Sequence, residues 1–225
     1  MKPAAAFVKR IRADFEANRN PVNAAPMAKY MLNQFPFLGI HMPQCRALLT
    51  PAMLEFKPWI DEKFLEHAAR AMFRLPEREY HHAAVMLLDR FQSKLTRVSI
   101  ALLRELIQKN SWWDTVDALS TRCVGPLVLR YPRLQGEMDA WSTDADLWIR
   151  RCAIVHQLRH KSRTDVERLF SYCVANAADK DFFIRKAIGW ALRYHARTDV
   201  RAVVEFVAEH PELSNLSKKE ALKHC

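Results

Sequence analysis

The 225-residue sequence predicts an all-α fold, and two observations support this prediction. Apolar residues recur with the 3.6-residue spacing of an amphipathic helix along nearly the whole chain, whereas no segment shows the alternation of a half-buried strand. The connections between these segments are short, so consecutive helices are expected to pack antiparallel. Half of the residues are hydrophobic, which is enough for one sizeable core or for an array of small units.

The predicted helices follow one another with little chain between them. Signals typical of helix starts are found at Asn23, Pro76-Glu77, Ser111, Thr164-Asp165 and Ser217. The expected helices are 3–18, 22–34, 43–55, 60–73, 77–91, 97–109, 112–120, 122–131, 133–142, 145–158, 164–176, 181–195, 199–209 and 217–224.

One segment of the sequence recurs at an offset of 35 residues. Residues 147–153 read LWIRRCA, and residues 182–188 read FFIRKAI. A further shift by 35 residues toward the N-terminus aligns Trp112-Trp113 with Leu147-Trp148. A period of roughly 35–40 residues made of two helices is typical of a HEAT-like or TPR-like superhelix. We therefore expect a curved solenoid over residues 1–225 as a single domain. A compact bundle is the alternative, because amphipathic helices also align by chance.

The repeat has a chemical consequence for four basic residues. In a solenoid, equivalent helices line one concave surface, so the pairs Arg150/Arg151 and Arg185/Lys186 are expected to recur along a basic concave groove. A row of cations along such a wall suits a phosphate backbone. The alternative is that these side chains only solvate the faces of their helices.

The charge balance favours a polyanionic partner. Lys and Arg number 35 and Asp and Glu number 25, which gives a formal net charge of +10. This excess favours nucleic acid first and an anionic membrane surface second. No apolar stretch approaches the ~18 residues of a membrane span, and residues 1–20 lack the apolar region of a secretory signal. We expect a cytoplasmic protein that does not bind membranes.

The sequence argues against several kinds of active site. The five cysteines show no CxxC spacing, so a disulfide framework or a zinc knuckle is not expected. His156 and His160 have the spacing of two metal ligands, with Cys152 one turn earlier, but the HExxH pattern is missing and Arg159 opposes a dication. The GxSxG, P-loop, kinase and GxGxxG signatures are also missing. We therefore expect neither a metal nor a cofactor.

The segment KNSWWDTVD at residues 109–117 combines an indole with a carboxylate. Trp113 and Asp117 are four residues apart and share one helix face, whereas Trp112 and Val116 share the face expected to point to the core. A carboxylate in a basic groove repels phosphate, so its presence there needs a chemical reason.

One such reason is the cleavage of an N-glycosidic bond. The sugar then becomes an oxocarbenium ion, which a carboxylate at ~4 Å stabilises by about 4 kcal/mol at an effective dielectric constant near ~20. The alternative is structural: Asp117 pairs with a neighbouring arginine such as Arg122, and Trp113 belongs to the core.

The sequence resembles the DNA alkylation repair glycosylases of the AlkD type, which are HEAT-like repeat proteins that remove alkylated purines from DNA. The resemblance extends from the second expected helix to the C-terminus. The matching segments are MAKYM at 27–31, FLGIHMPQCR at 37–46, LPEREY at 75–80, KNSWWDTVD at 109–117, DLWIRRCAI at 146–154, FFIRKAIGWALR at 182–193 and LSKKEALKH at 216–224.

The resemblance implies a role for five residues. Asp117 looks like the catalytic carboxylate that stabilises the sugar cation and orients the water. Trp113 and Trp190 look like the two aromatic residues that embrace the deoxyribose of the lesion. Arg151 looks like the basic residue near the phosphates of the lesion, and Tyr30 like a further aromatic residue at the DNA groove. The further DNA-binding residues expected from the basic pairs and from the same motifs are Arg150, Arg185, Lys186 and Arg193.

The resemblance also implies an activity. We expect a monofunctional glycosylase that removes cationic N3- and N7-alkylpurines, such as 3-methyladenine and 7-methylguanine, from double-stranded DNA without flipping the base. The protein is expected to act as a monomer. Two alternatives are a non-catalytic HEAT-repeat module that binds damaged or branched DNA, and a solenoid that binds other proteins.

Overall fold

The computed structural model describes residues 3–223, and within this range all regular elements are helical, which confirms the all-α prediction. The chain divides into two compact units, Met1–Leu102 and Leu103–Cys225, and the boundary falls inside helix α6. The superhelix, its concave groove and the single domain over residues 1–225 stay predictions. Residue 224 of the last expected helix and Cys225 lie outside the described residues.

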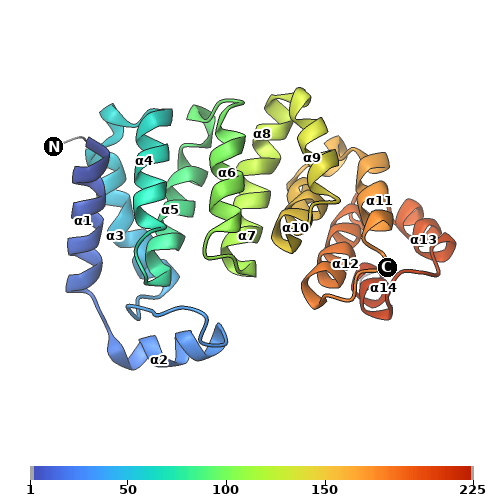
Figure 1. Ribbon diagram of the computed structural model, residues 1–225, viewed down its shortest axis with the longest axis horizontal. Coiled ribbons are helices and arrows are strands. Elements are labelled where there is room, and N and C mark those ends of the chain that lie inside the picture. Colours follow the sequence, from blue (N-terminus) through green and yellow to red (C-terminus); the bar gives the residue numbers. More distant parts are fainter. Residues whose placement is uncertain (1–2, 224–225) are drawn as a thin grey trace. The chain divides into compact units, whose positions relative to one another are not determined.

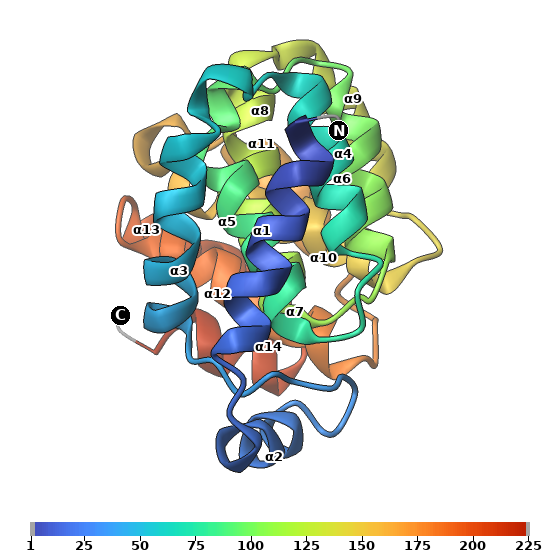
Figure 2. The same cartoon turned by 90° about the vertical axis from the view of Figure 1, so that its left-hand side faces the viewer.

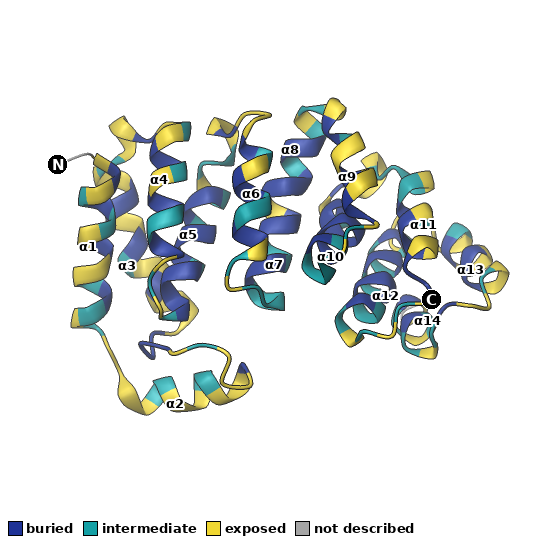
Figure 3. Ribbon diagram, in the orientation of Figure 1, coloured by how far each residue is buried: buried dark blue, intermediate teal, exposed yellow. Residues whose placement is uncertain are grey.

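Unit 1 is built from helices that short connections join, except for the longer loop over residues 31–41 between α2 and α3 (Figure 1). Helix α1 packs against α3 and α4, and α5 packs against the same two helices. Helix α2 stands apart from this core at one end of the unit, and none of its residues is buried (Figures 2 and 3). The elements are α1 (Pro3–Ala17), α2 (Pro21–Tyr30), α3 (Met42–Glu55), the 3-10 helix η1 (Lys57–Trp59), α4 (Glu62–Met72), α5 (Arg78–Arg90), the 3-10 helix η2 (Gln92–Lys94) and α6 (Ser99–Gln108).

The loop after α2 is held by a buried carboxylate. The helix expected over 22–34 ends at Tyr30, because the next residues include Leu32 and Asn33 in the left-handed region, with φ of 54° and 56°. The Glu79 side chain of α5 then accepts hydrogen bonds of 2.8–3.1 Å from three consecutive backbone N–H groups at residues 38–40. These bonds satisfy backbone N–H groups that have no helical hydrogen-bond partner.

Unit 2 contains the segments with the most informative motifs. Helix α10 packs against α12, and α12 packs against α14. The helix expected over 145–158 ends earlier and continues as a 3-10 turn. The elements are α7 (Trp113–Leu119), the π-helix η3 (Ser120–Val124), α8 (Gly125–Arg130), the 3-10 helix η4 (Pro132–Leu134), α9 (Gln135–Trp141), α10 (Leu147–Val155), the 3-10 helices η5 (His156–Arg159) and η6 (Lys161–Arg163), α11 (Val166–Ala175), α12 (Phe182–Ala196), α13 (Val200–Glu209) and α14 (Asn215–Ala221).

Residues 113–130 form one continuous helix with a π-helical turn in its middle, where the sequence predicted two separate helices. Pro126 explains the wide turn, because its ring clashes with the carbonyl four residues earlier in a regular α-helix. Gly125 is needed for a second reason. A Cβ atom at this position lies 2.2 Å from the carbonyl oxygen of His156, so only glycine lets η5 approach the turn.

The local repeat of 35 residues is present in the hydrogen bonds of α10 and α12. Asp146 and Asp181 cap these two helices through their side chains, and the backbone N–H of each donates to an aspartate two residues earlier. In α7 the equivalent N-cap is Trp112, so the step from α7 to α10 is 34 residues rather than 35. Asp117, Arg151 and Lys186 therefore occupy the same position in their three helices.

The Gly189 backbone allows the close contact between α12 and α14. Glycine in the middle of a helix costs about 1 kcal/mol relative to alanine, so a packing reason is required. A Cβ atom at position 189 lies 2.4 Å from Cβ of Glu220 and 2.7 Å from the carbonyl oxygen of Ser217. Ser217 also donates a hydrogen bond of 3.0 Å to the carbonyl oxygen of Arg185. Helix α14 begins at Asn215, two residues before the start predicted at Ser217, because the Ser214 side chain caps it.

Replacing Gly189 by alanine is expected to destabilise the protein by about 1–2 kcal/mol, because overpacking outweighs the gain in helix propensity. The matched control is Gly136→Ala on α9, where a Cβ atom meets nothing within 4 Å. This variant should gain about 0.5–1 kcal/mol. Urea unfolding of the three proteins measures both changes. Equal effects of the two substitutions contradict the proposed packing.

Candidate active site

A cleft of about 370 Å³ lies between α7 and α12 in unit 2, and we call it the central cleft. It brings together three residues singled out from the sequence, namely Trp113 and Asp117 of α7 and Trp190 of α12. The 3-10 helix η5 completes its wall with Leu158 and Arg159. The other lining residues are Asp114, Ala118, Thr121, Arg122 and Tyr194.

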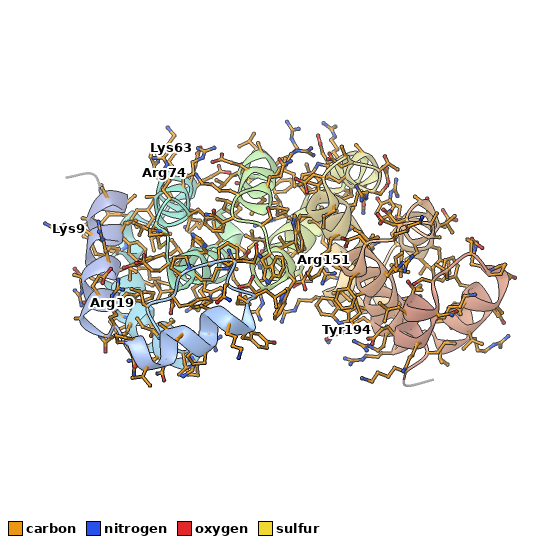
Figure 4. All side chains as sticks on the ribbon, turned by 60° about the horizontal axis from the view of Figure 1, so that its bottom comes forward. Lys9, Arg19, Lys63, Arg74, Arg151 and Tyr194 are labelled. Carbon is orange, nitrogen blue, oxygen red and sulfur yellow. The ribbon has the colours of Figure 1, made fainter. Side chains whose placement is uncertain are left out.

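Asp117 forms a bidentate ion pair with Arg151 of α10. Arg151 Nε donates to Asp117 Oδ1 at 2.7 Å, and Arg151 Nη2 donates to Asp117 Oδ2 at 2.8 Å. A third hydrogen bond runs from Arg151 Nη1 to the carbonyl oxygen of Phe183. The two side chains are only 14% and 6% exposed, so this is a largely buried pair (Figure 4 labels Arg151). Asp117 thus pairs with an arginine, as the structural alternative expected, but this arginine is Arg151 of α10 and not the nearby Arg122 that served as its example.

Burial and Arg151 act in opposite directions on the Asp117 carboxyl. Burial raises the pKa of Asp117, and the hydrogen bonds and positive charge of Arg151 oppose this rise. The negative charge of nearby Asp114 adds to the rise in pKa. Arg151 is thus the group that favours the ionised form of Asp117 in this poorly solvated position.

The Asp117 carboxylate keeps acceptor capacity on its cleft side. A carboxylate offers about four lone-pair sites, and Arg151 occupies one on each oxygen. Because the residue lines the central cleft, the remaining sites can accept from a water or face a developing positive charge there. The Asp117 backbone is held as well, since the hydroxyl of Thr121 donates to its carbonyl oxygen at 2.8 Å.

Trp113, the first residue of α7, and Trp112, its N-cap, have different environments. Trp112 packs against Trp148 and Phe183, with ring centroids 5.9 and 5.1 Å away, as the core-facing side of the helix was predicted to do. Trp113 is half-buried and lines the central cleft, so the alternative that places it in the core is wrong. Across the cleft, Trp190 makes an edge contact with Tyr194 at 5.8 Å.

The other predicted DNA-binding residues of unit 2 make ion pairs or hydrogen bonds within the unit. Arg150 pairs with Asp179 at 2.8 Å, and Arg185 donates to the carbonyl oxygen of the same residue at 2.8 Å. Glu220 of α14 binds both remaining cations. The distances are 2.9 Å to Lys186 and 2.8 Å to Arg193. These contacts account for the four cations without any ligand, so their DNA-binding role stays a prediction.

Tyr30 is the one predicted site residue in unit 1. It ends α2 and is 73% exposed. Tyr194 and Arg159 also line the central cleft, and neither was predicted to do so from the sequence. Tyr194 could have been found from its position one helical turn after Trp190. Arg159 lies in a 3-10 turn, where helical periodicity gives no signal.

His156 and His160 are buried and serve the packing of η5. Burial lowers the pKa of His156 to about 3 and that of His160 to about 4. His160 Nε2 lies 3.2 Å from the carbonyl oxygen of Gly125, which joins η5 to the π-helical turn.

Among residues 3–223, no group of three His, Cys, Asp or Glu side chains is placed to hold a metal ion. No helix in that range is long and apolar enough to cross a membrane.

Comparisons with known proteins agree with the resemblance. A family model described as DNA alkylation repair enzyme matches residues 11–225. A solved structure described as a predicted DNA alkylation repair enzyme from Enterococcus faecalis has 31% sequence identity and a TM-score of 0.86, covering 92% of this chain and 96% of its own. The protein smu.31 of Streptococcus mutans shares the fold at 17% identity, with a TM-score of 0.60 and coverage of 78% of this chain and 90% of its own. No curated protein sequence matches significantly.

Proposed function

This chain belongs to the DNA alkylation repair enzyme family, and from that premise we propose that it is a DNA glycosylase. The proposed substrates are cationic N3- and N7-alkylpurines in double-stranded DNA, such as 3-methyladenine and 7-methylguanine. The proposed reaction is hydrolysis of the bond between the base and C1′ of the deoxyribose. The protein would act as a monomer and without flipping the base, and Tyr30 would contact the DNA.

One observation supports this proposal above the others. The central cleft places the Asp117 carboxylate beside two half-buried indoles, those of Trp113 and Trp190. A carboxylate stabilises a nearby oxocarbenium ion, and indole faces attract cations by about 0.5–2 kcal/mol each. A cleft that only bound phosphate would not need this combination.

The proposed reaction needs no general acid. The bond from C1′ to the base breaks, and its electron pair neutralises the positive charge that alkylation placed on the purine. The water oxygen forms the new bond to C1′, and Asp117 accepts the hydrogen bond that orients this water. The water proton then passes by way of the carboxylate to solvent. One carboxylate is therefore enough, in contrast to the separated pair of carboxylates in sugar hydrolases.

Duplex DNA treated with a methylating agent tests the proposal. The protein should release free 3-methyladenine or 7-methylguanine, measured by chromatography, and leave an abasic site without cutting the strand. Strand cleavage is not expected because no lysine lines the central cleft within the described residues to form a Schiff base. DNA binding with no base released would favour a non-catalytic DNA-binding module, and no DNA binding at all would favour the protein-binding solenoid.

A further inference from the structure

The phosphates of a bound DNA need partners other than the basic pairs expected from the sequence. Asp179 already forms an ion pair with Arg150, and the single carboxylate of Glu220 pairs with both Lys186 and Arg193. Breaking such a partly buried pair to bind a phosphate exchanges one ionic contact for another, with little gain in free energy. Cations that have no carboxylate partner bind phosphate more favourably, because they release condensed counterions without that exchange.

Three such cations surround a second cavity of unit 2, which we call the basic pocket. Its volume is about 420 Å³, and its lining includes Arg159, Lys161 and Arg197 but no carboxylate. All three residues are exposed, and within the described part of the chain none of them forms an ion pair. The pocket also contains Thr198, whose hydroxyl group can donate a hydrogen bond, whereas the Thr164 hydroxyl already donates to the Lys161 carbonyl oxygen.

The basic pocket adjoins the central cleft through a common wall. Leu158, Arg159 and Tyr194 line both cavities. Along α12, an edge contact joins Trp190 to Tyr194, and the Arg197 guanidinium lies 4.3 Å from the centre of the Tyr194 ring. These three residues follow the i, i+4, i+7 spacing of one helix face, which leads from the cleft to the pocket. Tyr194, labelled in Figure 4, marks the boundary.

The wall of the basic pocket is fixed by the surrounding structure. Lys161 adopts a left-handed backbone conformation with φ of 57°, which is unfavourable for lysine and is held by hydrogen bonds from Thr164 to the Lys161 carbonyl oxygen. Leu169, which also lines the pocket, is buried in the core. His195 is buried in the wall, and burial lowers its pKa, so the positive charge of the pocket comes from the three cations.

We propose that the basic pocket binds a backbone phosphate of the DNA strand that carries the lesion, while the sugar of the lesion lies in the central cleft. This inference rests on the proposed function. Each cavity offers the charge that suits one part of the DNA strand, a negative charge for the sugar and positive charges for the phosphate. Asp117 faces the sugar that becomes positive, and Arg159, Lys161 and Arg197 face the phosphate that is always negative.

The salt dependence of binding to undamaged duplex DNA tests this site without any base release. Lys161→Gln and Arg197→Gln should each lower affinity and reduce the slope of log K against log salt by about one, as expected for the loss of one phosphate contact. Arg133→Gln is the matched control, since Arg133 is exposed in the same unit and lines neither cavity. Slopes that fall equally in all three variants, or in none, overturn the proposal.

A second experiment locates the phosphate. A duplex with a positively charged azasugar at one position sets the register, because its cation mimics the sugar that Asp117 is proposed to stabilise. Neutral methylphosphonates then replace the neighbouring phosphates one at a time. At one position the substitution should weaken binding of the wild type about tenfold and leave Arg197→Gln nearly unaffected. Equal weakening of both proteins at every position overturns the basic pocket.

The two proposals can fail separately. A protein that releases methylated bases, but whose Lys161→Gln and Arg197→Gln variants keep the wild-type salt slope, has the proposed activity without the basic pocket. A protein whose slope falls in these variants, but which releases no base, has the pocket without the proposed activity.

Discussion

Replacing Asp117 by asparagine is expected to lower the rate of base excision by about 10²–10³-fold while DNA affinity changes little. The amide keeps the size of the side chain but cannot carry the negative charge that faces the sugar cation. It also provides only one acceptor oxygen, so one of the two hydrogen bonds from Arg151 is lost. Single-turnover excision of 7-methylguanine, with protein in excess over DNA, measures the chemical step directly.

Asp114→Asn is the control for this experiment. Asp114 also lines the central cleft, and it adds negative charge near Asp117. If a specific carboxylate is required, Asp114→Asn should change the excision rate less than about tenfold. Equal losses in both variants would instead indicate that either carboxylate of the cleft serves the reaction, and an undiminished rate in Asp117→Asn would contradict the assignment of the catalytic carboxylate.

The local part of the candidate site could be predicted from the sequence. Helical spacing alone places Trp113 and Asp117 on one face, and the structure has both at the central cleft, while Trp112 packs away from it although it is the N-cap of α7 rather than part of the helix. The tight crossing at Gly189 was also foreseeable, since glycine in the middle of a helix needs a packing reason. Such features depend on the regular geometry of one helix, which a short stretch of sequence determines.

The partner of Asp117 could not be found in the same way. Sequence proximity favours Arg122, but Arg151 reaches Asp117 from another helix, 34 residues further along the chain. That contact depends on how α7 and α10 pack, including the wide turn imposed by Pro126. For the same reason, the sequence could not show that Glu220, from α14, forms ion pairs with two of the expected DNA-binding cations, Lys186 and Arg193.

Replacing Arg151 by alanine should have the largest effect on stability. The substitution leaves a buried carboxylate without its partner, which typically costs about 3–5 kcal/mol. Arg151→Lys keeps one charge but cannot form the bidentate contact, so an intermediate loss is expected. Urea unfolding of both variants measures the loss. In the background of Asp117→Asn the cost of Arg151→Ala should be smaller, because no buried negative charge is left uncompensated.

The same variants separate two roles of Arg151. Three of its five N–H groups bind Asp117 and Phe183, so two remain for the phosphate contact that the family resemblance implies. If that contact exists, Arg151→Ala reduces the salt slope of DNA binding by about one. An unchanged slope combined with reduced stability limits Arg151 to positioning Asp117.

The pH dependence of the Arg151 variants follows from the opposing effects on Asp117. Burial raises the pKa of Asp117 and Arg151 opposes the rise, so Arg151→Lys should raise this pKa further. Excision requires the ionised carboxylate, and its rate should therefore begin to fall at a higher pH in the variant than in the wild type. The free energy of unfolding should respond to pH in the opposite direction to the excision rate.

Below the raised pKa of Asp117, the folded state holds a proton that the unfolded state still lacks. The free energy of unfolding therefore rises as the pH falls through this raised pKa. An acid limb that does not move would show that Asp117 does not need Arg151 to stay ionised.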